Sequence, residues 1–461
     1  MLESGAVKEA LARLEESLRI DPHSPDTLLA LASAQIGAGD LARAGEAIGL
    51  ASECASRQNQ SDALPGAAGK PGRETIETLT RLGDSLYARN RLTEAAAAYE
   101  AALAASPDDP AIITHLANVL LAENRLPQAI EGYERALALR PDDPWIRYCL
   151  GLAYLTAGDF RRGWGYFEAR LDRQPLWREL NRRRWQGRPS NSSGKSMLLL
   201  TEQGLGDVLH FIRYVPTVVA MGFRVSVLVD PGLKPLLASQ SWLEAAYDKQ
   251  DQRPDFDEYC PLLSLPWILS HDVQALPAPA PYLRVPPDRL APARRRLAAF
   301  AGTKVGFVWA GNPKHERDQM RSLSLQRLAT ILPKEGGSLF SLQQRCPAAD
   351  RRTLDHLPGL HDLSDELSDF AATAAFVSQL DLVVSVDTSV AHLAGALGVP
   401  VWILLPFAPD WRWQLERSDS PWYPTARLYR QPALGDWTPV LSRIAHDLAE
   451  FVRIRQGREA P

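Results

Sequence analysis

The chain has 461 residues, of which 45% are hydrophobic and 23% are charged, so it is a globular protein too long for a single hydrophobic core. Its formal net charge of −4 excludes a strongly basic protein that binds nucleic acid through its overall field. No window holds the ~18–20 apolar residues of a membrane span or the apolar core of a signal peptide, which predicts a cytoplasmic protein. The cysteines form no C-x-x-C pair, as expected in a reducing compartment: Cys54, Cys149, Cys260 and Cys346.

A repeat of 34 residues runs through the first part of the chain, where RLGDSLYARNRLTEAAAAYEAALAASPDDP (81–110) aligns with HLANVLLAENRLPQAIEGYERALALRPDDP (115–144). Each unit places a small residue where two helices approach, and an aromatic residue four positions later on the same helix face. The positions that keep the spacing are Leu82, Leu116 and Leu150; Ala95, Ala129 and Gly163; and Tyr99, Tyr133 and Phe167. The pattern predicts a helix-turn-helix solenoid, and it resembles the tetratricopeptide repeat over about residues 4–172.

We assign residues 1–173 to this solenoid. Residues 4–20 look like the second helix of a repeat, so we expect the chain to begin in the middle of a repeat. The segment RQNQSDALPGAAGKPGR (57–73) holds two prolines and three glycines and is predicted to be a mobile insertion. Arrays of this kind bind a protein segment along their concave face or support a neighbouring domain, and both alternatives stand.

The pattern changes at about residue 196, where short apolar runs begin to alternate with helical stretches. Six runs are predicted to be strands: 197–203, 223–229, 304–311, 337–343, 381–387 and 401–406. This alternation predicts parallel sheets covered by helices on both faces. The fold class is therefore α + α/β, a helical solenoid followed by two Rossmann-like units. We expect a linker at 174–195, one α/β unit at 196–290, and a second at 291–461 that includes the final helix.

Ligands in such sheets bind beyond the carboxyl ends of the strands, so the residues after each strand are candidates. After the first strand, EQGLGDVLHF (202–211) places Gly204 and Gly206 where the backbone can turn tightly near a ligand. Asp207 opens the following helix. It would cap that helix by accepting backbone N–H groups, or act as an acid–base catalyst, and the two roles are compatible.

The basic loop that follows the strand 304–311 is a candidate phosphate site. NPKHERDQMRSLSL carries Lys314, Arg317 and Arg321. Basic side chains above the end of a strand would stabilise the charge of a departing diphosphate, and a solvated surface loop is the alternative. Arg321 lies nearest the next predicted helix and is the preferred contact.

The segment DLVVSVDTSVAHLAGALGVPVWILLP (381–406) carries the strongest signal. Asp387 ends a predicted strand, and Thr388 and Ser389 begin a helix. Free N–H groups at that helix start, together with the helix dipole, form an anion site suited to a pyrophosphate. His392 lies four residues after Thr388 on the same helix face, either as a functional residue beside this site or as a half-buried structural histidine.

Trp411, Trp413 and Trp422 could stack on a base or a sugar, and packing at the rim of the site is the alternative. Histidine and cysteine residues show no metal-ligand spacing and no H-E-x-x-H occurs, so no metal site is predicted.

The order of GLGDVLHF, the basic loop and DTSVAHLAGALG resembles glycosyltransferase family 9 over residues 196–455. That family includes the ADP-heptose–lipopolysaccharide heptosyltransferases and has the GT-B fold, which the resemblance implies for this chain. With the repeats, the layout is similar to bacterial tetratricopeptide-repeat glycosyltransferase-like proteins. Ser389 and Arg321 depart from the family's usual glycine and lysine, which concerns the donor sugar more than the fold.

The resemblance also implies a role for each matching residue. Asp207 matches the catalytic base, and Arg321 falls near the basic residue that contacts phosphate. Gln343, after the strand 337–343, lies where further donor contacts are expected. The donor-site element matches four residues: Asp387, Thr388, Ser389 and His392.

The resulting hypothesis is a metal-independent, inverting glycosyltransferase that moves a sugar from a nucleotide diphosphate-sugar to a glycan or protein acceptor, with no further cofactor. The expected partners are this donor, the acceptor and a protein bound to the repeats, without nucleic acid. One alternative is a non-catalytic repeat scaffold with a degenerate GT-B region. Another is an NAD-dependent oxidoreductase in which Asp230 binds the ribose, although Leu209 stands where its loop needs a third glycine.

Overall fold

The structure is a computed structural model, and the chain divides into two compact units, Met1–Ala157 and Gly158–Pro461, which are described separately. The predicted insertion 57–73 lies outside the described residues apart from Arg73, as does most of the predicted linker 174–195. The structure describes residues 2–37, 40, 43, 46–47, 50–51, 54, 73–173, 184–188, 194–252, 254–269, 280–315, 317–333 and 337–459.

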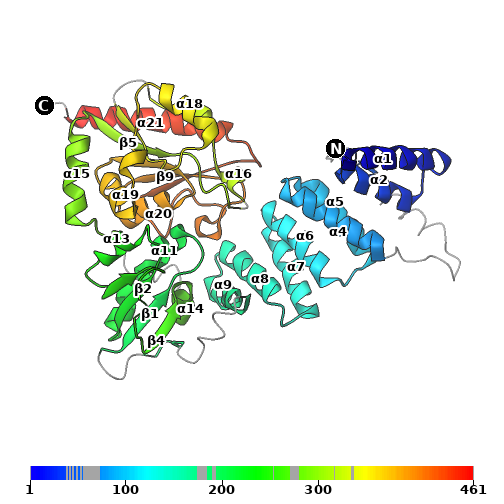
Figure 1. The fold of residues 1–461 in the computed structure, drawn as a ribbon, viewed down its shortest axis with the longest axis horizontal. Coiled ribbons are helices and arrows are strands. Elements are labelled where there is room, and N and C mark those ends of the chain that lie inside the picture. The colour runs from blue at the N-terminus through cyan, green and yellow to red at the C-terminus, as the bar shows by residue number, and fades with distance from the viewer. Residues whose placement is uncertain are drawn as a thin grey trace. The chain divides into compact units, whose positions relative to one another are not determined.

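The first unit is built from helices, and from α4 to α8 each helix packs against the next one along the chain (Figure 1). This arrangement confirms the predicted helix-turn-helix solenoid. The bounds of the helices are α1 Leu2–Ile20, α2 Pro25–Gly37, α4 Arg73–Ala88, α5 Leu92–Ala105, α6 Pro110–Ala122, α7 Leu126–Leu139 and α8 Pro144–Thr156.

Turn and cap residues recur along the first unit with the spacing of the repeat. Asp109 and Asp143 are the N-caps of α6 and α8, and each carboxylate accepts two backbone N–H groups of the first turn. A proline follows each aspartate at the first helical position, where a missing N–H group removes no helix bond. Asn90 and Asn124 adopt positive φ angles of 62° and 59° in the turns before α5 and α7. The repeat therefore specifies the turns as well as the helix faces.

The repeated tyrosines are buried between helices. Tyr99 is 2% exposed and Tyr133 is fully buried. Each hydroxyl donates to a side chain of the preceding helix, Tyr99 to Asp84 at 2.7 Å and Tyr133 to Asn118 at 2.7 Å. The ring of Tyr99 requires a glycine opposite it, because a Cβ on Gly83 would lie 2.4 Å from the ring. The aromatic position of the repeat thus fills a space that a small residue leaves open.

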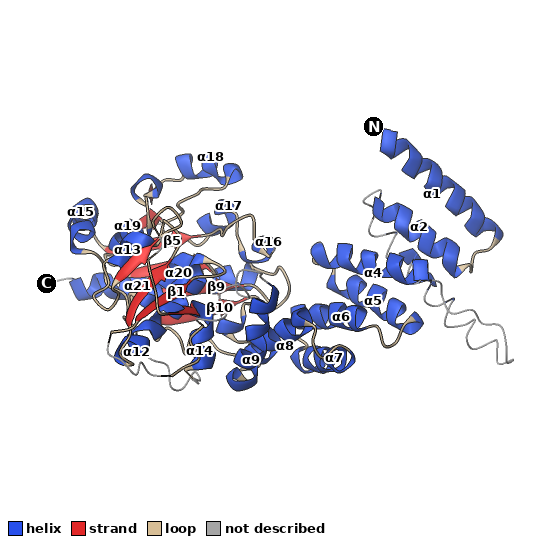
Figure 2. Ribbon diagram, turned by 60° about the horizontal axis from the view of Figure 1, so that its bottom comes forward, coloured by secondary structure: helices blue, strands red, loops and turns tan. Residues whose placement is uncertain are grey.

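The second unit contains two parallel sheets with helices packed around them (Figure 2). All six predicted strands are present and pair in parallel. The four-stranded sheet holds β1 Ser196–Leu200, β2 Arg224–Leu228, β3 Ala245–Tyr247 and β4 Glu258–Pro261. The six-stranded sheet holds β5 Thr303–Val308, β6 Gly337–Ser341, β7 Leu360–Asp362, β8 Leu382–Val386, β9 Val401–Leu405 and β10 Ala426–Arg430.

The helices of the second unit connect these strands. Those up to the second sheet are α9 Phe160–Phe167, η1 Glu168–Arg173, α11 Leu205–Phe211, η3 Ile212–Tyr214, α12 Val215–Ala220, α13 Lys234–Ala238, η4 Leu262–Ser264, α14 Leu265–Ile268 and α15 Pro287–Ala298. The others are α16 Asp318–Arg321, α17 Leu325–Ala329, α18 Ala348–His356, η6 Ser364–Glu366, α19 Phe370–Val377, α20 Ser389–Ala396, η7 Trp411–Trp413 and α21 Thr438–Glu459.

The strand order places the candidate residues near the topological switch points of the two sheets. The order β10-β9-β8-β5-β6-β7 reverses direction between β5 and β8, and the order β3-β2-β1-β4 reverses between β1 and β4. Ligands of open parallel sheets bind beyond the carboxyl ends of the strands at such switch points. The segments that follow β1, β5 and β8 carry Asp207, Arg321 and Asp387, so each of these residues follows a strand at a switch point.

The second unit also includes α9 and η1, although the repeat period assigns them to the solenoid. Helix α9 lies beside α14 (Figure 1). In η1, Arg170 is buried and donates to Glu202 at 2.6 Å and to Ser264 at 2.9 Å. Glu202 follows β1 and Ser264 follows β4, so this arginine ties the end of the repeat pattern to the smaller sheet.

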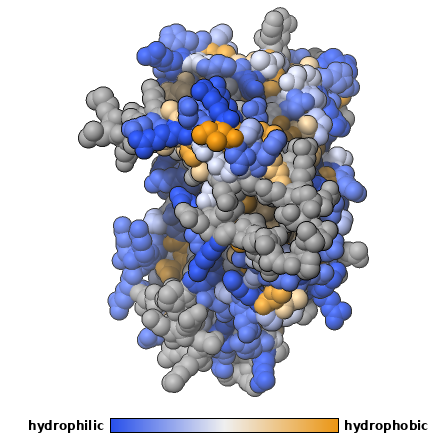
Figure 3. All heavy atoms as spheres, turned by 90° about the vertical axis from the view of Figure 1, so that its right-hand side faces the viewer, coloured by the Kyte–Doolittle hydropathy of each residue, from blue (hydrophilic) through white to orange (hydrophobic). Residues whose placement is uncertain are grey.

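The face drawn in Figure 3 is mostly hydrophilic where its residues are described, and hydrophobic side chains occur there in scattered patches. Within the described part of the chain, no helix combines the length and the apolar composition needed to cross a membrane.

Candidate functional site

The start of α20 presents unsatisfied backbone N–H groups at the end of β8. Thr388 is the N-cap, and its side chain accepts no backbone N–H group of the helix because its hydroxyl pairs with Ser385 Oγ at 3.0 Å. The first N–H groups of a helix have no acceptor within it, so those of Ser389 and Val390 can bind an anion. Both residues are partly exposed. The predicted helix start is therefore present and is not closed by its own cap.

Arg321 joins the two strands at the switch point of the larger sheet. It ends α16, in the segment after β5, and its Nη1 donates to the backbone oxygen of Asp387 after β8 at 2.8 Å. Its Nε donates to Asp318 Oδ1 at 3.1 Å. Gly311 leaves room for this arrangement, because a Cβ there would lie 2.7 Å from Arg321 Nη2 and 2.4 Å from Asp318 Oδ1 and would displace these side chains. The guanidinium group is thus fixed beside the start of α20.

Asp207 occupies the first turn of α11 and caps it. Its Oδ2 accepts the backbone N–H of Gly204 at 2.8 Å. Its Oδ1 accepts Nη2 of Arg412, whose Nη1 donates to Asp410 at 2.8 Å. Burial lowers the pKa of Arg412, but the carboxylates of Asp410 and Asp207 outweigh it and raise that pKa above its usual value. Capping and ion pairing therefore both hold the Asp207 carboxylate in place.

The starts of α11 and α20 lie side by side (Figure 1). Gly206 makes the close approach possible, because a Cβ at this position would lie 2.8 Å from His392 Cδ2 and 3.7 Å from Ser389 Cα. The two glycines predicted to lie near a ligand thus have separate functions. Gly204 donates its N–H to Asp207, and Gly206 lets one helix start reach the other.

His392 belongs to a buried polar group that joins the two sheets' helices. The hydroxyl of Tyr423 lies 2.9 Å from Nδ1 of His392 on α20 and 3.1 Å from Nδ1 of His210 on α11. Nε2 of His392 lies 3.9 Å from Asp387 Oδ1, and its ring stacks on Trp413. Burial, and then the cationic Arg412, lower the pKa of both histidines well below the usual value, so both are neutral at pH 7.

The charge of Asp387 depends on pH in the accessible range. Burial raises its pKa to about 6, and the nearby Asp410 carboxylate acts in the same direction. Arg321 and Arg412 oppose this rise without cancelling it. The carboxylate beside the predicted anion site is therefore partly protonated in mildly acidic solution.

Gln343 is turned toward the backbone of the larger sheet. It is 6% exposed, and its Oε1 accepts the N–H groups of Trp309 and Ala310 at 3.2 and 3.1 Å. Its Nε2 donates to the oxygens of Ala310 and Arg345. These bonds hold the loop after β5, and the contact of Gln343 with a donor stays a prediction.

Sequence reasoning did not single out Arg412 and Tyr423, nor their partners Asp410 and His210. The three tryptophans that could stack on a base or a sugar, or pack at the rim, are all buried, with Trp411 at 4%, Trp413 at 1% and Trp422 at 2% exposure. The signal was the sequence DWRW at 410–413, because an arginine between two buried aromatic residues requires an acidic partner. Nothing in the sequence indicates that this partner is Asp207, which lies 205 positions earlier.

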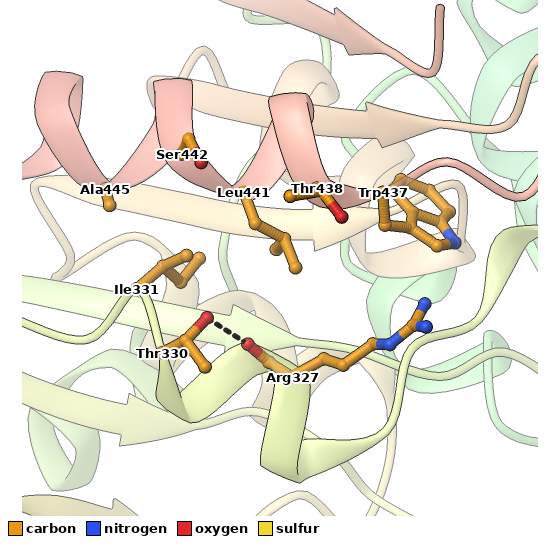
Figure 4. Close-up of a pocket in the computed structure, with 8 residues that line it drawn as sticks. All are labelled: Arg327, Thr330, Ile331, Trp437, Thr438, Leu441, Ser442 and Ala445. Carbon is orange, nitrogen blue, oxygen red and sulfur yellow. Dashed lines mark hydrogen bonds between the residues drawn. The ribbon is translucent and has the colours of Figure 1, made fainter. Parts of the chain in front are cut away.

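A surface pocket of about 390 Å³ lies elsewhere in the second unit, between α17 and the start of α21 (Figure 4). It contains none of the residues described above. Its lining consists of Arg327, Thr330, Ile331, Trp437, Thr438, Leu441, Ser442 and Ala445. Within the described ranges, no group of three or more histidine, cysteine, aspartate or glutamate side chains is placed to hold a metal ion.

Comparisons with known proteins identify the repeats. The family model described as TPR repeat matches residues 83–122 and 117–158, and a second one, described as tetratricopeptide repeat, matches residues 1–63. Protein FlbA of Caulobacter vibrioides is 28% identical over 329 residues, which are 64% of this chain and 54% of FlbA. The chain thus spans about half the length of this curated relative.

Solved structures that resemble part of the chain include two glycosyltransferases. ADP-heptose lps heptosyltransferase II of E. coli has 15% identity and a TM-score of 0.40, with 57% of this chain and 99% of that chain covered. A glycosyl transferase family 9 protein of Veillonella parvula has 10% identity and a TM-score of 0.39, with 51% and 86% covered. Likenesses of this size carry no argument about activity. The chain contains tetratricopeptide repeats at residues 1–63 and 83–158, and an α/β region with two parallel sheets follows them.

Proposed function

We propose that the α/β region is a glycosyltransferase that moves a sugar from a nucleotide diphosphate-sugar to an acceptor hydroxyl, with inversion at the sugar carbon. The observation that supports the proposal is the meeting of two helix starts. The start of α11 carries the carboxylate of Asp207, and the start of α20 presents N–H groups beside Arg321. The residue proposed as the base and the helix start proposed as the phosphate site thus belong to neighbouring helices, which supports the roles that the motif resemblance implies.

On the donor side, the diphosphate would bind at the start of α20. The N–H groups of Ser389 and Val390 and the helix dipole favour an anion there. Arg321, fixed by its bond to the backbone oxygen of Asp387, would meet the negative charge that develops on the leaving diphosphate. Because Arg321 and the N–H groups would compensate the negative charge of the leaving diphosphate, the proposed mechanism assigns no step to a metal ion. Transfer should therefore survive treatment with EDTA.

On the acceptor side, Asp207 would be the general base. Its two oxygens each accept one donor, and each carboxylate oxygen keeps a further lone pair for an acceptor hydroxyl. The hydroxyl oxygen forms a bond to the anomeric carbon while its proton passes to Asp207. The bond from that carbon to the diphosphate oxygen breaks, and its electron pair leaves with the diphosphate. The acceptor, a glycan or a protein segment, would approach from the smaller sheet.

The variant Asp207→Asn tests this assignment. An asparagine keeps one oxygen for the N–H of Gly204 but no longer pairs with the buried Arg412 as a carboxylate, so Tm should fall. Loss of the base should lower transfer by the folded variant by about 100-fold or more. Stabilisation by a nucleotide sugar in a thermal-shift assay should remain. The matched control is Asp230→Asn, which removes a carboxylate that bonds the N–H of Gly232 in the turn after β2. Near-normal turnover of the Asp207 variant would remove Asp207 as the base.

The second candidate function is a non-catalytic scaffold that recruits protein partners through its repeats. The repeat matches favour it, as does the pairing of both Asp207 oxygens within the protein. A thermal-shift panel of nucleotide sugars separates the two functions, because a scaffold should respond to none of them. NAD belongs in the same panel, since stabilisation by NAD alone would support the oxidoreductase alternative.

A further inference from the structure

Helix α9 completes the repeat pattern of the first part of the chain but packs with the candidate active site. It follows the last tetratricopeptide match, which ends at residue 158, and it belongs to the compact unit that begins at Gly158. Its aromatic side chains are buried, with Phe160 at 7%, Trp164 at 3% and Phe167 at 1% exposure.

Trp164 contacts two rings that flank the arginine of the site. Its ring centroid lies 5.1 Å from that of Trp411 at an angle of 87°, and 5.8 Å from that of Phe211 at 76°. Both are edge-to-face contacts of the kind that favour a fixed ring orientation. The guanidinium carbon of Arg412 lies 4.4 Å from the Trp411 centroid and 5.3 Å from the Phe211 centroid. The same two rings therefore contact both Trp164 and Arg412.

Arg412 transmits this support to the proposed base. It is 5% exposed and pairs with Asp207 and Asp410. Phe211 ends the helix α11 on which Asp207 lies, so Trp164 supports both partners of the ion pair by separate contacts. The printed contacts thus connect Trp164 with Asp207 through Trp411, Phe211 and Arg412.

We propose that Trp164 is a positioning residue for the Asp207–Arg412 pair, so that the last helix of the repeat pattern is a functional part of the active site. The inference rests on the proposed function, in which Asp207 is the base. If the tryptophan is truncated, Trp411 and Phe211 can relax into the space, and Arg412 can move with them. Displacement of a catalytic group by about 1 Å can lower a rate by about 100-fold even when the substrate still binds.

The experiment uses the full-length chain with Trp164→Ala, Trp164→Phe and a matched control, Trp185→Ala. Trp185 is also buried, at 1% exposure, but it packs on Phe223 at 5.7 Å, away from the site. Trp164→Ala should lower kcat by about 10- to 100-fold with little change in donor affinity. Trp164→Phe keeps an aromatic ring against Trp411 and Phe211 and should restore most of the turnover. Trp185→Ala should lower Tm but leave the kcat of the folded protein within about twofold of wild type.

A double-mutant cycle with Arg412→Lys separates positioning from general packing. If Trp164 acts through Arg412, Trp164→Ala should change kcat by less than about twofold in the Arg412→Lys background. Equal losses in both backgrounds, or a Trp164→Ala variant with normal kcat, would overturn the inference while leaving the proposed function intact.

Failure of the proposed function would be recognised by a wild-type chain that transfers no sugar from any nucleotide sugar. The inference is then decided by stability alone, from the Tm values of Trp164→Ala, Asp207→Asn and the double variant. If the double variant loses less Tm than the two single variants lose together, Trp164 and Asp207 are coupled through the ion pair. Additive losses would overturn it.

Discussion

Asp387 is the residue through which pH should act on the site. Its pKa is raised from an ordinary value of 3.8 to about 6, chiefly by burial. Between these two values the unfolded chain carries an ionised Asp387 while the folded protein keeps it protonated. The folded state therefore binds more protons, and its stability falls as the pH rises through this window, with the loss complete above about pH 6.

The affinity for the nucleotide sugar should also fall as the pH rises. A nucleotide sugar brings a diphosphate whose charge is constant in this range, and protonation of Asp387 removes a negative charge beside it. The affinity for the nucleotide sugar should therefore rise about tenfold as the pH falls from about 8 to about 5. Isothermal titration of a nucleotide sugar at several pH values measures this change. The variant Asp387→Asn should show a flat profile, and an equally steep profile in that variant would assign the titration to another group.

Individual site residues differ in how far the sequence reveals them. Asp387, Thr388 and His392 could be predicted because a strand end, a cap and a helix face follow from local pattern. Arg412 could not, because its burial and its pairing with Asp207 depend on tertiary packing. Gln343 follows a strand as predicted, but its amide bonds the neighbouring loop, and sequence position does not reveal which partner an amide has.

At the scale of the elements, the caps of the repeat helices should contribute measurably to stability. Asp109→Ala removes the acceptor of two N–H groups at the start of α6 and should cost about 1 kcal/mol. Amide exchange in α6 should then accelerate by about fivefold, as measured by hydrogen exchange and mass spectrometry. The matched control is Asp142→Ala, next to the cap of α8, which should leave the exchange of both helices unchanged. Unchanged exchange in the Asp109 variant would contradict the capping role.

The strands that sequence pattern missed share a position in the sheets. All six predicted strands are present, and the four others, β3, β4, β7 and β10, are the edges of the two sheets. Interior strands are covered on both faces and appear as continuous apolar runs. Edge strands are shorter or carry charged residues, as in the ARLYR of β10, so they lack this signal.

At the scale of the whole chain, the period of the repeat and the compact units divide the sequence differently. The period continues through Gly163 and Phe167, whereas the second unit already begins at Gly158. The difference arises because α9 and η1 find their buried partners in the α/β region, among Trp411, Phe211 and Glu202. A periodic pattern shows which face of a helix is buried but not which element covers it.

The buried ion pair of Arg170 with Glu202 should stabilise the packing of η1 against the smaller sheet. Arg170→Met keeps an apolar stem but leaves Glu202, itself 6% exposed in its side chain, without its cation. Removing one partner of a buried ion pair costs about 3–5 kcal/mol, so urea should unfold the second unit at a clearly lower concentration. Arg173→Met, at the exposed end of η1, is the control and should change the midpoint little. A midpoint like that of wild type in the Arg170 variant would show that the pair does not hold the junction.

Gly395 of α20 limits which sequences this helix can accept. A Cβ there would lie 2.4 Å from the ring of Tyr423, the residue whose hydroxyl meets both His210 and His392. Alanine is normally a better helix former than glycine by about 1 kcal/mol, yet here the added methyl would displace the phenol. In a library of random variants, position 395 should therefore admit glycine alone. Substitutions that would raise the helix propensity of α20 at this position are excluded by the ring of Tyr423, which lies 28 positions later in the chain.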